Sequence, residues 1–336
     1  MSQKMNIKVT YIVTCYNHEN YIEDALHSAF QQSYKNIHFI ISDDCSSDNS
    51  FKLIENVVAM YPKLNISINK NDVNLGIGQH MNKLLESSNG DLIVMAAGDD
   101  ISLQDRVKVL VDNWVKYDKP SIVASSLHEI DAKGKSIESE ISFRFNVDHP
   151  IKYNFESIED YLNGKLLACA GSTMAYSSDV IKKFGVYDTK INSEDVVYFF
   201  RGMLCKGVLI LNDRLIKYRR SESSFSAPTS SNWNLFKSPQ NNYPIDFNLL
   251  RLNQAKSDLL KYHSSNIRLS ARIDQLIDIE LIKIGLNNKN LCIRIGNYMK
   301  ARHLGCANNN SLIAILLPRV VYKLIYNVRY NLKNRT

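Results

Sequence analysis

Short apolar runs alternate with amphipathic segments over the first 130 residues of the chain. The apolar runs predict buried strands over residues 7–14, 36–42, 64–69, 91–95 and 121–126. The segments between them predict helices over residues 19–32, 47–60, 76–87 and 102–117. This alternation is typical of an α/β fold with a mostly parallel sheet and helices on both faces. Such sheets bind their ligands at the carboxyl ends of the strands.

The pattern is less regular in the second half of the chain. It predicts a strand over residues 171–176, a helix capped by Ser193 over residues 193–205, and closing strands over residues 208–211 and 214–218. Residues 221–242 are rich in Ser, Asn and Pro and predict a loop, after which the pattern is helical. We therefore expect a first domain over residues 1–226, a linker over residues 227–242 and a helical C-terminal extension over residues 243–336.

The charge of the chain is unevenly distributed. The formal net charge is +7, from 41 basic and 34 acidic residues, but residues 281–336 hold ten basic residues and no acid. The remainder therefore carries 31 basic and 34 acidic residues, a net charge of −3. A mildly acidic body with a basic tail argues against a nucleic-acid-binding protein and predicts an anionic partner for the tail.

The basic tail contains a predicted amphipathic helix over residues 318–333. On a helical projection Arg319, Lys323, Arg329 and Lys333 fall within roughly 120° of one another, opposite an apolar face. Two interpretations remain open, a surface helix packed on the core or a helix lying on anionic lipid. The absence of acids from this stretch favours the lipid surface.

The sequence offers no strong signal for a membrane span or for a disulfide framework. No apolar run reaches the roughly 18–20 residues of a membrane-spanning helix. Lys8 interrupts the first apolar run, so this run does not match the continuous apolar core of a secretory signal. The six cysteines are dispersed without a CxxC pair, which favours reduced thiols in a cytosolic protein.

Four polar clusters lie where predicted strands end or the next helix begins. Three follow predicted strands, at residues 14–17, 43–48 and 97–100, and one lies at the start of a predicted helix, at residues 74–78. A single cluster of this kind is explained by helix capping. Several acidic clusters at one sheet edge are harder to explain in this way, because their carboxylates repel one another. A divalent cation that carries phosphate oxygens would relieve this repulsion.

These clusters resemble the motifs of the family 2 glycosyltransferases. The family patterns P-T/C-Y-N-x-E, D-D-G-S-x-D, N-x-G, D-A-D-D and E-D are matched in order at residues 14–19, 43–48, 74–76, 97–100 and 194–195. The resemblance covers about residues 7–226 and implies the GT-A fold. It also implies a nucleotide-sugar pocket lined by Thr14, Tyr16, Asn17 and Asp43, with Asn74 helping to hold the nucleotide.

The resemblance further implies a metal site at the end of the fourth predicted strand. Asp99 would bind Mn²⁺ or Mg²⁺ at the donor diphosphate, and Asp100 would lie close to the donor sugar or to the ligands of the metal. Ala97 stands where the family has its first Asp, which predicts weaker metal binding. Cys45 replaces the usual Gly, and Arg219 or Arg220 would meet a phosphate or lie in solvent.

Asp195 is the candidate catalytic base, and Glu194 is its orienting neighbour. An inverting transfer needs one carboxylate to take the proton of the acceptor hydroxyl, and the first turn of a helix favours an ionised carboxylate. On spacing alone the same residues would be an acidic helix start, and the order of the motifs favours the catalytic interpretation.

The implied function is inverting, metal-assisted transfer of a sugar from a nucleotide sugar, with a UDP-sugar as the expected donor. A glycan or polyisoprenoid-linked acceptor in polysaccharide assembly would suit a cytoplasmic enzyme held peripherally at the inner membrane. A non-catalytic nucleotide-sugar-binding module is the alternative, supported by Ala97. A nucleotidyltransferase is a weaker alternative, because residues 14–20 lack a glycine-rich loop with a basic residue.

Overall fold

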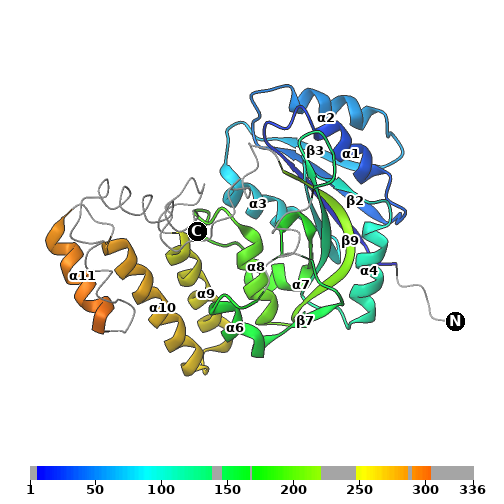
Figure 1. Cartoon of the computed structure of the whole chain (residues 1–336). Coiled ribbons are helices and arrows are strands. Elements are labelled where there is room, and N and C mark those ends of the chain that lie inside the picture. Colours follow the sequence, from blue (N-terminus) through cyan, green and yellow to red (C-terminus); the bar gives the residue numbers. More distant parts are fainter. Residues whose placement is uncertain (1–5, 138–145, 167–168, 221–246, 287–289, 304–336) are drawn as a thin grey trace, which may run out of the picture. The chain divides into compact units, whose positions relative to one another are not determined.

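In the computed structural model, the strands between residues 9 and 220 form one β-sheet (Figure 1). The structure describes residues 6–137, 146–166, 169–220, 247–286 and 290–303. The strand order is β3-β2-β1-β4-β8-β6-β9-β5, and β7 pairs with β9. The strands are β1 (Val9–Cys15), β2 (Ile37–Asp43), β3 (Asn65–Lys70), β4 (Leu92–Ala97), β5 (Ile101–Ser102), β6 (Ile122–Asp131), β7 (Ile151–Tyr153), β8 (Met174–Ser177) and β9 (Val208–Arg220).

The strands that carry the polar clusters run parallel and end together. β1 lies between β2 and β4 and is parallel to both, with Cys15 opposite Asp43 and Thr14 opposite Ala97. β8 is antiparallel to β4 and to β6, whereas β6 and β9 are parallel. The prediction of a mostly parallel sheet is confirmed. Its consequence is that the segments after β1, β2 and β4 meet at one edge.

Helices cover both faces of the sheet (Figure 1). On one face lie α1 (Ile22–Phe30), α2 (Ser50–Ala59) and α4 (Arg106–Lys116), and on the other lie α3 (Gly76–Ser87), α7 (Ser178–Phe184) and α8 (Glu194–Met203). The shorter elements are α6 (Ile158–Leu162) and the 3₁₀ turns η1 (Phe155–Ser157) and η2 (Gly171–Thr173). Because helices cover both faces, both sides of β1 are buried, and its sequence is accordingly mostly apolar, with two threonines, Thr10 and Thr14.

Two predicted elements differ from the structure. The helix predicted from residue 102 begins at Arg106, because Ile101 and Ser102 pair with β9 as the short strand β5. The two closing strands predicted over residues 208–218 form the single strand β9, whose register against β6 shifts on either side of Ser126. An irregular register of this kind breaks the apolar alternation without ending the strand.

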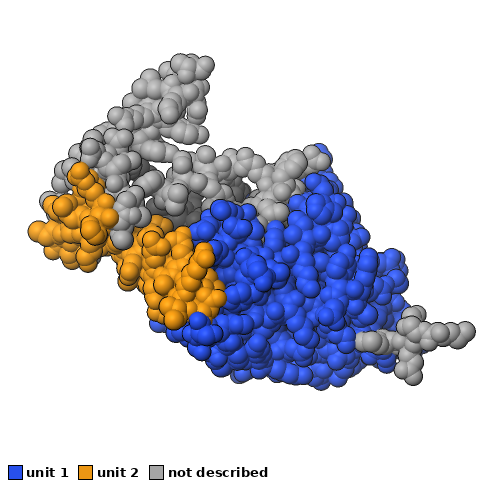
Figure 2. Space-filling view, turned by 90° about the horizontal axis from the view of Figure 1, so that it is seen from below, with its two compact units in different colours: residues 1–243, 257–265 blue, residues 244–256, 266–336 orange. Residues whose placement is uncertain are grey.

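The chain forms two compact units, each with its own internal contacts (Figure 2). The first comprises residues 1–243 and 257–265, and the second residues 244–256 and 266–336. The C-terminal helices are α9 (Phe247–His263), α10 (Ile267–Leu286) and α11 (Leu291–His303). The predicted domain boundaries at residues 226 and 242 and the predicted helix at 318–333 lie outside the described residues, so they stay predictions. Among the described helices, none has the length and apolar character needed to cross a bilayer.

Candidate active site

The segment after β1 is tied to the segment after β2. Asn17 has a left-handed backbone, with φ of 55°, and its N–H donates to Ser46 Oγ at 2.8 Å. Its side-chain oxygen in turn accepts from the N–H of Ser47 at 2.9 Å. Thr14 is half-buried at the strand end, and Tyr16 remains 45% exposed beside it. Three residues predicted for the nucleotide pocket thus lie together on one pair of cross-linked loops.

Asp43 lies beneath these loops and is fully buried. Its two carboxylate oxygens accept from the N–H of Ser46 at 2.8 Å and from the hydroxyl of Ser46. The next residue but one, Cys45, has a φ of 64°, which explains why glycine suits that position in the family pattern. Asp43 therefore shapes the loop that the nucleotide would contact.

Asp44 holds the third loop and was not among the predicted site residues. Its carboxylate accepts from Asn71 Nδ2 and the N–H of Leu75, both at 2.9 Å, and from the N–H of Gly76 at 3.0 Å. Asn74, predicted to help hold the nucleotide, is exposed, and its side-chain oxygen also accepts from Gly76, at 2.8 Å. The available sequence signal was that Asp44 is the second acid of a D-D pair after one strand and that the N-x-G turn follows the next strand.

The Asp99–Asp100 pair follows β4. Asp100 is 5% exposed and accepts from the backbone N–H of Arg219 at 2.8 Å, whereas its second oxygen is buried without a partner among the described residues. Burial, and next the neighbouring charge of Asp99, raise the pKa of Asp100 to about 8. Asp99 is half-buried, and no described residue donates a hydrogen bond to its carboxylate. Asp99 is therefore the acid of this pair that remains open to a ligand.

A buried cation, Arg106, lies behind this pair and was not predicted. Arg106 is 0% exposed, and its guanidinium donates to the carbonyls of Met95 at 2.6 Å and Ser172 at 2.5 Å. It also donates to Ser102 Oγ at 2.9 Å, and its charge lowers the pKa of Asp100 against the effect of burial. Arg106 thus connects β4 to the η2 turn and provides positive charge near the acids.

The Glu194–Asp195 pair occupies the first turn of α8. Ser193 does not cap the helix through its side chain, as had been expected, but donates its hydroxyl to Asp195 Oδ1. The same oxygen accepts from the N–H of Val196 at 2.8 Å. Burial is the main cause of the raised pKa of both acids, and it brings the pKa of Glu194 to about 8. The expected preference of the helix start for an ionised acid is thus outweighed by burial.

The η2 turn lies between the two acidic pairs. A Cβ at Gly171 would collide with Glu194 Oε1, so the turn packs directly on this carboxyl group. The carbonyl oxygen of the adjacent Ser172 accepts a hydrogen bond from Arg106, and the Ser172 hydroxyl lowers the pKa of Asp100. The structure therefore brings the Asp99–Asp100 and Glu194–Asp195 pairs next to one short turn, although almost 100 residues separate them in sequence.

The two arginines at the end of β9 make structural contacts. The Arg219 guanidinium donates to the carbonyl of Asp99 at 2.8 Å and lies 4.6 Å from the ring centroid of Tyr21. Arg220 is 3.4 Å from the buried carboxylate of Glu129. Neither is the solvated surface residue that was one of the two expectations, and Arg219 holds the segment that carries Asp99.

The oxygen donors present suit a hard divalent cation that is completed by phosphate. Within the described ranges, no group of three or more His, Cys, Asp or Glu side chains could enclose a metal ion. Asp99 offers a free carboxylate, and Mg²⁺ commonly uses one or two protein carboxylates together with substrate phosphate oxygens. Mn²⁺ or Mg²⁺ at Asp99 is therefore compatible with this site only as a metal shared with a bound diphosphate.

Comparison with known families matches residues 10–185, just over half of the chain, to "Glycosyl transferase family 2". The chain is 29% identical over 127 residues to the putative glycosyltransferase EpsE of Bacillus subtilis, covering 38% of this chain and 45% of EpsE. It is 26% identical over 215 residues to the uncharacterized glycosyltransferase MJ1057 of Methanocaldococcus jannaschii, covering 63% of this chain and 70% of that protein. The chain thus spans less than half of the length of EpsE.

Solved structures of TarS from Staphylococcus aureus are similar in fold. TarS is a poly(ribitol-phosphate) beta-N-acetylglucosaminyltransferase, and its complexes with UDP and with UDP-GlcNAc both give a TM-score of 0.57. These matches have 17% and 18% identity and cover 82% of this chain and 71% and 72% of TarS. They confirm the predicted α/β fold of GT-A type with a helical C-terminal part. The family match over more than half of the chain shows that the chain belongs to glycosyl transferase family 2.

Proposed function

We propose that the chain is an inverting glycosyltransferase that moves a sugar from a nucleoside diphosphate sugar to an acceptor hydroxyl. The observation that carries the proposal is that the Asp99–Asp100 pair, which follows the parallel strand β4, and the Glu194–Asp195 pair both lie next to the η2 turn. One pair can serve the leaving diphosphate, which gains negative charge, and the other the acceptor hydroxyl, which loses a proton. Membership of the family supports the same reaction class.

Asp195 is the proposed base. Its carboxylate takes the proton of the acceptor hydroxyl while the hydroxyl oxygen forms a bond to the anomeric carbon. The bond from that carbon to the nucleoside diphosphate breaks on the opposite side, so the configuration inverts. The hydroxyl of Ser193 and the N–H of Val196 hold one oxygen of Asp195, and in the proposal the other oxygen receives the proton of the acceptor. Glu194, with its pKa raised to about 8, is largely protonated at neutral pH and does not compete as a base.

A UDP-sugar is the proposed donor. TarS, which shares the fold, has been solved with UDP and with UDP-GlcNAc. In the proposal Thr14, Tyr16, Asn17 and Asp43 line the base and ribose and Asn74 supports the nucleotide, because these residues gather on the loops after β1 and β2 and before α3. Asp99 would hold Mn²⁺ or Mg²⁺, and Asp100 would lie near the donor sugar. The metal supplies positive charge that stabilises the leaving diphosphate.

The proposed acceptor is a glycan or a polyisoprenoid-linked glycan in polysaccharide assembly. The proposed place is the cytoplasmic face of the inner membrane, reached peripherally through the basic stretch at residues 281–336. This stretch contains ten basic residues and no acid, which suits an anionic lipid surface. Nucleic acid is not a proposed partner, because residues 1–280 carry a net charge of −3.

The alternative is a nucleotide-sugar-binding module without turnover. Ala97 in place of the first acid of the family pattern favours this alternative, whereas the held carboxylate of Asp195 favours catalysis. A nucleotidyltransferase is less well supported, because the loop after β1 lacks glycine and a basic residue.

Thermal-shift measurements against a panel of nucleotide sugars, with and without Mn²⁺, test the donor, because a ligand of the native state raises the Tm. The donor that binds is then assayed for release of its nucleoside diphosphate with glycan and polyisoprenoid-linked acceptors. Binding without turnover in every case would favour the module.

A further inference from the structure

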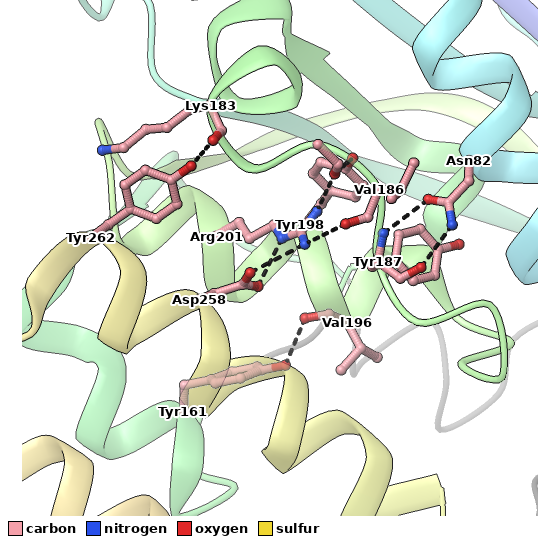
Figure 3. A network of polar contacts seen from close by, with 11 residues as sticks. Asn82, Tyr161, Lys183, Val186, Tyr187, Val196, Tyr198, Arg201, Asp258 and Tyr262 are labelled. Carbon is pink, nitrogen blue, oxygen red and sulfur yellow. Dashed lines mark hydrogen bonds and ion pairs between the residues drawn. The ribbon is translucent and has the colours of Figure 1, made fainter.

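Arg201 lies in α8 and connects this helix to the C-terminal part of the first unit. It is 0% exposed and stands six residues after Asp195, about 9 Å along the helix axis. Its Nε and Nη2 atoms contact the two carboxylate oxygens of Asp258 in α9, at 2.8 Å and 3.2 Å (Figure 3). Asp258 is only 4% exposed. The pair is therefore a buried, two-pronged ion pair between two helices of one unit.

The same guanidinium also holds the connection between α7 and α8. It donates to the carbonyl of Gly185 at 2.8 Å and to that of Val186 at 3.2 Å. The rings of Phe184 and Tyr198 lie 5.2 Å and 5.1 Å from its central carbon. Because these contacts use donors on both sides of the guanidinium, Asp258 fixes the orientation in which Arg201 can reach the two carbonyls.

The connection is held from its other side by α3. Asn82 donates to the carbonyl of Tyr187 at 2.8 Å and accepts from its N–H at 3.2 Å (Figure 3). A Cβ at Gly78 would collide with the carbonyl oxygens of Thr189 and Ile191, so the backbone of this connection packs directly on α3. The start of α8, and with it Asp195, is therefore set by the connection between α7 and α8.

Residues 257–265, which include the last part of α9, make further contacts in the same region. The Tyr262 hydroxyl donates to the carbonyl of Lys183, and its ring lies 4.5 Å from the ring of Phe184 in an edge-on arrangement. This segment lies beyond residues 10–185, the part of the chain that the family match covers. Its contacts are nevertheless with the elements that lead into the helix of the proposed base.

We propose that Asp258 is a positioning residue for Asp195 and acts through Arg201, so that residues 257–265 are a functional part of the catalytic unit. The proposal rests on the proposed function, in which Asp195 is the base. Without Asp258, the guanidinium is buried without its counter-charge, which costs free energy. We therefore expect the Arg201 side chain to turn toward solvent. Arg201 would then release Gly185 and Val186, and α8 would shift. A shift of about 1 Å at a catalytic group can reduce turnover about 100-fold.

The first test is Asp258→Asn in the full chain. We expect kcat for sugar transfer to fall ~10- to 100-fold while KM for the donor changes by less than about twofold, because the nucleotide loops are untouched. Amide hydrogen exchange over residues 194–203 should accelerate. The matched control is Asp112→Asn, which breaks an exposed ion pair with Lys108 (2.9 Å) on α4. A wild-type kcat for Asp258→Asn would overturn the proposal.

A second set of variants separates positioning from stability. Val57→Ala, in the buried face of α2, lowers the Tm without touching α8 and reports how far stability alone affects kcat. Arg201→Met combined with Asp258→Leu replaces the buried pair by apolar groups, which often preserves stability. We expect this double variant to recover much of the Tm but to keep a low kcat, because Gly185 and Val186 lose their donor. A wild-type kcat in the double variant would contradict positioning. So would a kcat loss in Asp258→Asn that is no larger than the loss in Val57→Ala at equal Tm.

Asp195→Asn is assayed alongside to distinguish the two proposals. If Asp195→Asn retains turnover, the proposed base is wrong, and Asp258 is not its positioning residue. If Asp195→Asn is inactive while Asp258→Asn is fully active, only the positioning proposal fails. If the wild-type chain turns over no donor, the proposed function fails, and unchanged hydrogen exchange over residues 194–203 in Asp258→Asn would then also remove the structural link.

Discussion

Asn82 and Tyr187 are hydrogen-bonded in both directions, although 105 residues separate them. The Asn82 side chain is 5% exposed and satisfies both the N–H and the carbonyl of Tyr187. A side-chain amide carries a donor and an acceptor side by side, so it can pair with both backbone groups of one residue. The pair fixes the connection before α8 to α3, whose first residues belong to the nucleotide loops.

Asn82→Ala should therefore lower the free energy of unfolding. Each buried backbone group left without a partner costs about 1–3 kcal/mol, and two groups lose their partner here. Chemical denaturation measures the change. The control is Asn56→Ala on the exposed side of α2, which should change stability by less than about 0.5 kcal/mol. Equal stability of the two variants would show that the Asn82 contacts contribute nothing to the fold.

The apolar pattern predicted the parallel strands and the edge at which their loops meet. This was possible because a strand that is buried on both faces is mostly apolar along its length. It could not predict Arg106, which lies on the buried face of α4 among apolar residues and contacts Ser172, 66 residues away. Periodicity indicates which face of a helix is buried but not which polar side chain finds partners there. The η2 turn was predicted as the start of a strand for the same reason, since its position is set by Arg106 and Glu194 rather than by local preference.

Asp195→Asn should abolish transfer while donor binding is preserved. Loss of a general base typically reduces the rate ~10²- to 10⁴-fold, and Asn keeps the size of the side chain. Glu194→Gln should have a smaller effect at neutral pH, because Glu194, with a pKa near 8, is already largely protonated and Gln resembles that form. Transfer rates and donor affinity are measured for both variants.

The control for the base is Asp179→Asn. Asp179 is also an acid in the first turn of a helix, α7, but it is exposed and pairs loosely with Lys206 at 3.7 Å. It should leave both the rate and donor affinity unchanged. Near-wild-type turnover of Asp195→Asn would remove Asp195 as the base, and a larger loss for Glu194→Gln than for Asp195→Asn would reverse the two roles.

Asp99→Asn should weaken nucleotide binding only when a divalent cation is present. The amide retains a weak oxygen ligand but loses the charge that attracts Mn²⁺ or Mg²⁺. Titration calorimetry of UDP with Mn²⁺, and again with chelator, measures the difference. Asp105→Asn, an exposed acid that contacts Ser33, is the control. If UDP binds the wild-type chain equally well with and without Mn²⁺, the metal assignment of Asp99 fails.

Removal of the chain after Asn310 should release the protein from anionic vesicles. Residues 311–336 contain Arg319, Lys323, Arg329, Lys333 and Arg335, and each basic residue close to an anionic surface contributes about 1 kcal/mol to binding. Co-sedimentation with vesicles of anionic and of zwitterionic lipid measures the effect at two salt concentrations. Full-length protein that binds neither vesicle would leave the tail as a packing surface.

His80 should make the chain less stable as the pH falls through the range of histidine titration. Its ring is 4% exposed and contacts Ser42 Oγ at 2.7 Å on β2. Burial lowers its pKa below the ordinary value of 6.5, and Lys83 acts in the same direction, whereas Asp44 and Asp43 oppose the shift. The folded state therefore binds this proton less readily than the unfolded state does.

The contribution of His80 is consequently complete above the unfolded pKa of about 6.5 and is lost as the pH falls toward the lowered folded pKa. Asp100 and Glu194 act in the opposite sense, because their raised pKa values favour the folded state as the pH falls below about 8. The comparison must therefore be made between the wild type and His80→Gln, in which these other groups cancel. Denaturation from pH 8 to pH 5 should show the wild type losing stability relative to His80→Gln below about pH 6.5, and parallel curves would show that His80 does not titrate differently on folding.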